Sequence, residues 1–383
     1  MSTTSPPQST LPGARAIVAL FLLVLVTPGV GLALGFGRNT VSESELRELA
    51  TFPTWSWKIR DVVSWPSRFE VYFEDHFALR GQLIDARAWL LWHGLGTSAA
   101  DGVVAGRHDW LFYADDGGLD DWTQAKPFSE AELADWATTL LRRRAYLAKR
   151  GIAFVFVIAP DKQMIYPEFM PGTVRRLREG FRADTLIAYM RRVAPDFEIL
   201  DLRPPLLAAK STDLLYHHYD THWSDRGALV AYQAIVNALR VRFPAIRALQ
   251  RGDFVEDATM PSGDRTTMLG LDDAGKRQLP GLRLRRGRGY RVVEPATPDP
   301  YGEDGLLITE HQDRSLPRAI VFRDSFGARL IPYLSEHFSR VAYYWQNEFD
   351  FDAIEAEHPD VVIQEFVARH FYTYGPYPKS IPD

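Results

Sequence analysis

Apolar residues occur in short runs that alternate with amphipathic stretches over most of the chain. Residues 152–160 (IAFVFVIAP) form a continuous apolar run, which is typical of a central strand in a parallel sheet. Before it, a helix is predicted from Ser129 to Gly151, because Ser129 and Glu132 form a capping-box pattern and Gly151 favours a helix end. This alternation predicts an α/β fold with a mostly parallel central sheet flanked by helices.

The alternation continues toward the C-terminus. Helices are predicted near 182–193, at 225–243 with Ser224 as the capping residue, and at 328–338, and strands at 197–202, 318–323, 340–344 and 360–365. In open α/β sheets, ligands bind beyond the carboxyl ends of the strands. Asp161-Lys162 and Asp324-Ser325 both follow predicted strands, so we expect the functional site at this edge.

The N-terminal part has a different pattern. Residues 1–13 are rich in Ser, Thr and Pro and are predicted to form a disordered tail. A run of 21 residues without a charged side chain follows, and it predicts a single transmembrane anchor over residues 14–36. A cleaved signal peptide with a site near Ala33-Leu34-Gly35 is the alternative. Residues 37–66 are predicted to be a stalk, and residues 67–383 the folded domain.

Composition excludes several classes of function. The net charge of -5 offers no basic face for a phosphate backbone, so no nucleic-acid partner is expected. The chain has no cysteine, which excludes disulfide bonds, thiol nucleophiles and zinc–thiolate sites. Its 10 Trp and 16 Tyr suit either a sugar-binding groove or a hydrophobic core, and we assign Trp110 and Phe112 to the core.

Ser325 lies in the motif FRDSFG, between a predicted strand and a predicted helix. Its hydroxyl would be presented on a sharp turn. Backbone N–H groups at such a turn can stabilise the negative charge that develops on a carbonyl oxygen during acyl transfer. The alternative is that Asp324 or Ser325 only caps the helix.

A second motif, YHHYDTHWSDRG, places Asp220 and His222 just before a predicted helix. A serine hydroxyl becomes a good nucleophile when a base removes its proton, and an imidazole base needs a carboxylate to fix its tautomer. The motif could instead be a surface turn, or a metal site built from His217, His218, Asp220 and His222. Together with an exposed serine turn, the Asp-x-His pattern favours a catalytic triad, with no metal and no cofactor.

Three longer segments, IAPDKQMIYPEFMP, DTHWSDRGALVAYQA and VFRDSFGARLIPYLSEHF, resemble the SGNH-hydrolase-like domain of bacterial alginate O-acetyltransferases of the AlgJ and AlgX type. Shorter agreements extend the resemblance over most of residues 41–371. It implies a triad with Ser325 as nucleophile, His222 as base and Asp220 as orienting carboxylate. The motif order is reversed relative to ordinary SGNH enzymes, and Arg323 replaces the glycine of their Gly-Asp-Ser block.

The resemblance also implies a function. We expect O-acetylation of an exopolysaccharide, alginate-like or other, through an acetyl-serine intermediate. A polytopic membrane acyltransferase would supply the acetyl group, and the catalytic domain would lie on the periplasmic side of the inner membrane. A deacetylating esterase with the same triad and a non-catalytic polysaccharide-binding component are the alternatives.

Further residues are weaker candidates for substrate binding. Lys162 and Tyr166 follow the strand at 152–160 and could line a groove for a carboxylated sugar. Arg323 could orient substrate or pair with a buried acid. Asn347 is a candidate oxyanion donor, together with the backbone N–H of Ser325.

Glu365 and Arg369, four residues apart near the end of the domain, are predicted to form a structural ion pair.

Overall fold

The computed structural model describes residues 14–33, 41–42, 47–77, 83, 86–87, 90–94, 102–262, 279–294 and 305–376. The chain divides into two compact units, one reaching Ala99 and a larger one that comprises most of the chain from Ala100 onward. The predicted domain start at residue 67 stays a prediction.

The N-terminal unit is described over residues 14–33, 41–42, 47–77, 83, 86–87 and 90–94. Its main elements are helices α1 (Ala14–Ala33) and α2 (Ile59–Asp75) and the paired strands β1 (Val41–Ser42) and β2 (Arg47–Glu48). Within the part of the chain that the structure describes, no helix is both long and apolar enough to cross a membrane. The anchor predicted over residues 14–36 is therefore not confirmed. The tail at residues 1–13 lies outside the described residues.

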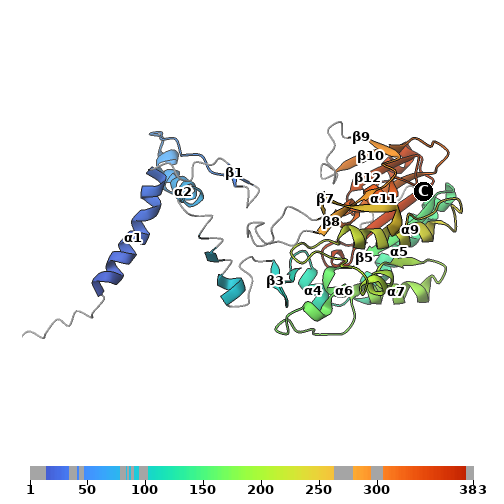
Figure 1. The fold of residues 1–383 in the computed structure, drawn as a ribbon, viewed down its shortest axis with the longest axis horizontal. Helices are drawn as coiled ribbons and strands as arrows, with labels where there is room; N and C mark the ends of the chain where they lie inside the picture. Colours follow the sequence, from blue (N-terminus) through green and yellow to red (C-terminus); the bar gives the residue numbers. More distant parts are fainter. Residues whose placement is uncertain are drawn as a thin grey trace, which may run out of the picture. The chain divides into compact units, whose positions relative to one another are not determined.

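A seven-stranded mixed sheet forms the centre of the larger unit (Figure 1). In spatial order its strands are β6 (Ile199–Asp201), β5 (Ala153–Ala159), β13 (Val361–Val367), β11 (Arg318–Arg323), β12 (Arg340–Trp345), β10 (Leu306–His311) and β9 (Tyr290–Glu294). Strands β6 to β12 of this order run parallel, whereas β10 is antiparallel to both of its neighbours. The predicted α/β fold is confirmed, and the β9–β10 pair makes the sheet mixed.

Successive side chains of the strands enter two apolar layers, one on each face of the sheet. Val157 packs in the layer that contains α9 (Asp225–Leu239). Its neighbour Phe156 packs in the opposite layer, with α5 (Glu130–Lys149) and α7 (Arg182–Val193). Both strand residues have no exposed surface. The two layers keep water from the sheet and leave the ends of the strands as the place for a polar site.

The predicted capping residues of two helices are confirmed. In α5, the hydroxyl of Ser129 accepts a hydrogen bond from the Glu132 N–H, and the Glu132 carboxylate accepts one from the Ser129 N–H. In α9, Ser224 caps the helix by accepting from the N–H of Gly227. Each cap contributes about 1 kcal/mol.

The predicted helix at 328–338 is wrong in its bounds. The chain instead forms two short helices, α10 (Ser325–Ala328) and α11 (Ile331–Leu334). Pro332 has no N–H to donate to the carbonyl of Ala328, so the first helix ends and a second one begins around the proline.

The remaining elements surround the sheet. They are the antiparallel pairs β3 (Val103–Ala105) with β4 (Leu111–Tyr113) and β7 (Phe254–Ser262) with β8 (Leu279–Leu284), and the helices α4 (Gly118–Thr123), α6 (Lys162–Ile165), α8 (Arg203–Ala209), α12 (Phe351–Glu357) and α13 (His370–Thr373). Trp110 and Phe112 are buried, which confirms their assignment to the core.

Candidate active site

Polar residues gather where the parallel strands end. Asp161 follows β5, the pair Asp324-Ser325 follows β11, and Arg369-His370 follows β13. Because the carboxyl ends of parallel strands share one edge of a sheet, these residues lie close together. The strand ends selected from the sequence therefore carry one cluster of polar residues.

Ser325, His222 and Asp220 form a continuous hydrogen-bonded chain. The Ser325 Oγ and His222 Nε2 atoms are 2.8 Å apart, and His222 Nδ1 is 2.8 Å from Asp220 Oδ1. The same Asp220 oxygen accepts a hydrogen bond from the backbone N–H of His222. A carboxylate at Nδ1 favours the tautomer with its proton there, which leaves Nε2 to accept the serine proton. The arrangement can generate a serine nucleophile.

The loop that carries His222 is tied to the turn that carries Ser325. Tyr216 and Trp223 form a β-bridge across the base of the loop. The indole N–H of Trp223 donates to the carbonyl oxygen of Phe326, 3.1 Å away, and Trp223 is completely buried. This bond links two segments about a hundred residues apart in sequence and fixes the distance between base and nucleophile.

Lys162 is hydrogen-bonded to the backbone of this loop and does not line a groove. Only 2% of its surface is exposed, and its ammonium group donates to the carbonyl oxygens of His217, His218 and Asp220 at 2.9, 3.2 and 2.6 Å. Burial lowers the pKa of Lys162 to about 7, although the Asp220 carboxylate acts in the opposite direction.

Tyr166, like Lys162, is buried and bonded to the backbone of the segment that leads to His222. Its side chain is buried, its hydroxyl accepts a hydrogen bond from the Leu215 N–H, and its ring packs 4.5 Å from that of Trp110. Burial and these contacts correct the prediction that Lys162 and Tyr166 line a groove: both hold the loop that ends in the triad.

A pocket with a volume of about 710 Å³ opens beside the triad. Its wall is made by Tyr113, Asp116, Thr221, His222, Arg323, Asp324, Ser325, Trp345, Gln346, Asn347, Glu348, Arg369, His370 and Tyr374. Two of the predicted substrate-binding residues, Arg323 and Asn347, are therefore at the pocket. Within the described part of the chain, the buried side-chain oxygen of Asn347 has no hydrogen-bond partner.

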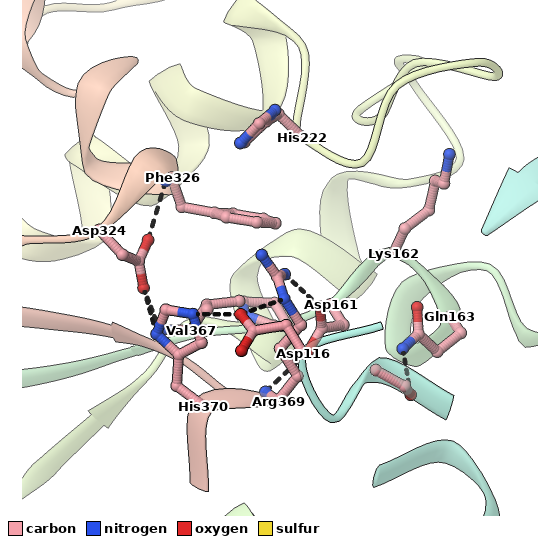
Figure 2. Close-up of polar contacts among 12 residues, drawn as sticks. Asp116, Asp161, Lys162, Gln163, His222, Asp324, Phe326, Val367, Arg369 and His370 are labelled. Atoms are coloured by element: carbon pink, nitrogen blue, oxygen red, sulfur yellow. Dashed lines mark hydrogen bonds and ion pairs between the residues drawn. The ribbon is translucent and has the colours of Figure 1, made fainter. Parts of the chain in front are cut away.

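Asp324 holds the nucleophile turn in place (Figure 2). One of its carboxylate oxygens accepts from the Phe326 N–H at 2.8 Å, and the other accepts from the Val367 N–H at 2.7 Å. The first bond caps α10 and the second joins the turn to β13. The capping interpretation is thus correct for Asp324, while the Ser325 hydroxyl is directed to His222.

A chain of polar contacts continues from Asp324 through His370 to Asp116, as Figure 2 shows. His370 Nδ1 lies 3.4 Å from an Asp324 oxygen, and His370 Nε2 lies 2.8 Å from Asp116. Arg369 donates to Asp161 at 2.7 Å. Burial alone would raise the pKa of Asp116, but the hydrogen bond and charge of His370, together with Arg369, lower it below its usual range.

Sequence reasoning missed Asp116, His370 and the role of Arg369. The strand-end rule that selected Asp324 would also have selected Arg369-His370, because both follow the predicted strand at 360–365. Asp116 has no comparable signal, since it follows the short β4 strand.

Glu365 does not pair with Arg369, contrary to prediction. Its side chain is completely buried, and an oxygen accepts a hydrogen bond from the Asp324 N–H at 3.2 Å. Burial raises the pKa of Glu365 well above its usual value, and the Asp324 carboxylate adds to the rise. Arg369 forms its ion pairs with Asp161 and Asp116 instead.

The alternative interpretation of the Asp-x-His loop is a metal site. In residues 102–262, 279–294 and 305–376, no three His, Asp or Glu side chains are grouped so that they could hold a metal ion. Asp220 and His222 are hydrogen-bonded to one another.

Comparison with known proteins gives a family match. Residues 103–347 match the family described as an SGNH hydrolase-like domain, acetyltransferase AlgX. The chain is 30% identical over 253 residues to the probable alginate O-acetylase AlgJ of Pseudomonas syringae, with 63% of this chain and 59% of that protein covered. For AlgJ of Pseudomonas putida the identity is 30%, over 57% and 54% of the two chains. The match thus spans less than two thirds of these relatives.

A solved structure shares the fold. The structure of Bacillus cereus PatB1 superposes with a TM-score of 0.53 and 16% identity, covering 70% of this chain and 96% of that one. At this identity the likeness concerns the fold alone.

Proposed function

Because the chain belongs to the family of SGNH hydrolase-like acetyltransferases of the AlgX type, we propose that it transfers an acetyl group through Ser325 to a hydroxyl group of an exopolysaccharide. The observation that supports this most directly is the Asp220–His222–Ser325 hydrogen-bonded chain at the wall of an open pocket. O-acetylation is also the activity in the names of the AlgJ relatives.

The first half of the reaction forms the acetyl-enzyme. His222 removes the Ser325 proton, and the serine oxygen attacks the acetyl carbonyl of the donor. Negative charge then develops on the carbonyl oxygen. Ser325 is the first residue of α10, so its N–H has no partner within the helix and can donate to this oxygen, as can the amide of Asn347. The tetrahedral intermediate collapses, and the leaving group takes the proton from His222.

The second half transfers the acetyl group. A sugar hydroxyl enters the pocket, His222 removes its proton, and the hydroxyl oxygen attacks the acetyl-serine carbonyl. The bond to Ser325 breaks, and the serine oxygen recovers its proton from His222. Asp220 stabilises the imidazolium in both halves. Transfer rather than hydrolysis requires that the sugar displace water from the pocket.

The cellular setting belongs to the same proposal. A polytopic membrane acyltransferase would supply the acetyl group, and the reaction would take place on the periplasmic side of the inner membrane during export of the polymer.

An assay with three outcomes tests the proposal. The full chain is incubated with an activated acetyl ester and an oligosaccharide, and the products are analysed by mass spectrometry. Acetylated sugar supports the transferase. Free acetate alone, with no acetylated sugar at any acceptor concentration, would identify an esterase, and neither product would identify a binding component. Ser325→Ala should lower product formation at least ~10⁴-fold.

A further inference from the structure

The guanidinium groups of Arg323 and Arg369 at the pocket already interact with other groups of the protein. Arg369 is 4% exposed, donates to Asp161 at 2.7 Å and lies 3.6 Å from Asp116. Arg323 has no exposed surface; it donates to the carbonyl oxygen of Asp324 and stacks on the Trp345 ring at 4.5 Å. Recognition of a carboxylate by arginine needs the planar fork of N–H donors. Neither arginine presents that fork to a ligand.

Carboxylates line the pocket wall together with these cations. Asp116, Asp324 and Glu348 line it, against two arginines. His370 is itself engaged by Asp116 at 2.8 Å. With a pKa below its usual range, Asp116 is an anion at neutral pH. A ligand carboxylate in this pocket would approach these carboxylates while the cations beside them are already paired, which is costly where water is partly excluded.

Lys162, which the sequence analysis proposed as a contact for a carboxylated sugar, cannot bind such a ligand. Its ammonium group is buried and donates to three backbone carbonyl oxygens beneath the loop. It is not part of the pocket wall.

The same wall suits an uncharged sugar. The Asp116 side chain is 24% exposed and can accept hydrogen bonds from hydroxyl groups, and the Asn347 amide can donate or accept. Tyr113, Trp345 and Tyr374 provide aromatic surface for the apolar face of a sugar ring. We propose that the acceptor is a neutral polysaccharide whose sugars carry hydroxyl groups and no carboxylate. This inference rests on the proposed acetyl transfer and narrows its substrate class.

Two acceptors that differ at C6 of each sugar, with a hydroxymethyl group in one and a carboxylate in the other, test the inference. β-1,4-linked mannose oligosaccharides and β-1,4-linked mannuronate oligosaccharides of equal length share ring and linkage, but the second carries a carboxylate on each sugar. The full chain receives p-nitrophenyl acetate as donor, and kcat/KM for each acceptor is measured from the acetylated product. We expect the mannose series to be preferred by about tenfold or more, and the preference to shrink as salt screens the repulsion.

The possible results show whether the inferred acceptor class or the proposed acetyl transfer is at fault. Equal or better use of the mannuronate series overturns the inference, as does rejection of both series by a chain that forms acetyl-serine. Acetyl-serine is followed independently, by the burst of p-nitrophenol released without acceptor. A chain with no burst contradicts the proposed function itself, and the inference with it.

A matched pair of variants tests the electrostatic cause. Gln346 lies on the pocket wall and has no part in the proposed chemistry. Gln346→Lys adds a cation there and should raise mannuronate use several-fold relative to mannose, whereas Gln346→Met, of similar length, should not. If the two variants discriminate between the acceptors to the same degree, charge is not the cause of the preference.

Discussion

At the scale of single residues, Lys162 influences the site through the backbone. Its ammonium group donates to the carbonyl oxygens of His217, His218 and Asp220, the residues that lead to the base. A buried carbonyl left without a donor costs about 1–3 kcal/mol. Loss of the ammonium group should therefore shift the loop and move His222 away from Ser325.

We expect Lys162→Met to slow formation of the acetyl-enzyme by about 10- to 100-fold, because small displacements of a catalytic group have effects of this size. The KM for the donor should change little, since the pocket wall is intact. Stopped-flow release of p-nitrophenol measures the rate. Lys149→Met, at the exposed end of α5, is the control and should behave as wild type. A wild-type rate in Lys162→Met would show that the loop keeps its position without the lysine.

At the scale of elements, the turn from β11 into α10 depends on close packing at Gly327. A Cβ atom at this position would lie 2.6 Å from the Cβ of Arg323 and 2.9 Å from a carboxylate oxygen of Glu365. Both distances are shorter than van der Waals contact. The helix can approach the strands only because residue 327 has no side chain.

We predict that Gly327→Ala displaces α10, lowers the free energy of unfolding by about 1–3 kcal/mol and reduces acetyl transfer. Urea denaturation measures the first effect and the transfer assay the second. Gly252→Ala is the matched control, because an added Cβ there meets no heavy atom within 4 Å. Equal stability of the two variants would contradict the packing argument.

The elements that sequence predicts well are those with a strong local signal. Strand β5 is a continuous apolar run, and α5 starts at a capping box, so both were predicted to within a few residues. Strands β9 and β10 were missed because they contain polar residues and are stabilised by antiparallel pairing that sequence does not reveal.

Residues of the candidate site likewise differ in whether they have a local sequence signal. Asp220 and His222 share one turn, and Ser325 follows a strand, so each has a signal that can be recognised locally. The bond from Arg369 to Asp161 joins residues 208 positions apart, and such a pairing is a property of the folded sheet.

At the scale of the whole molecule, two buried histidines make stability depend on pH. Burial lowers the pKa of His217 and of His337 to about 4. His337 also shares a hydrogen bond with the Tyr232 hydroxyl. In the unfolded chain a histidine titrates near 6.5, so between about 4 and 6.5 the unfolded state binds more protons than the folded state. The stabilising contribution of these groups is complete above 6.5 and is lost as the pH falls toward 4.

We therefore expect the free energy of unfolding to fall as the pH is lowered from 6.5 to 4.5, and to fall less steeply in His337→Gln, which lacks one of the two titrating groups. Urea denaturation at a series of pH values gives both slopes. If the two proteins show the same slope, His337 does not titrate differently in the folded and unfolded states.

The proposed function depends on the transient attachment of an acetyl group to one oxygen atom of the protein. The most direct measurement is intact-protein and peptide mass spectrometry of the full chain, quenched within seconds of mixing with p-nitrophenyl acetate in the absence of acceptor. We predict one added acetyl group on the peptide that contains Ser325, its disappearance when acceptor is supplied, and no such adduct in Ser325→Ala. An acetyl group found on another residue, or transfer that persists in Ser325→Ala, would contradict the role assigned to Ser325.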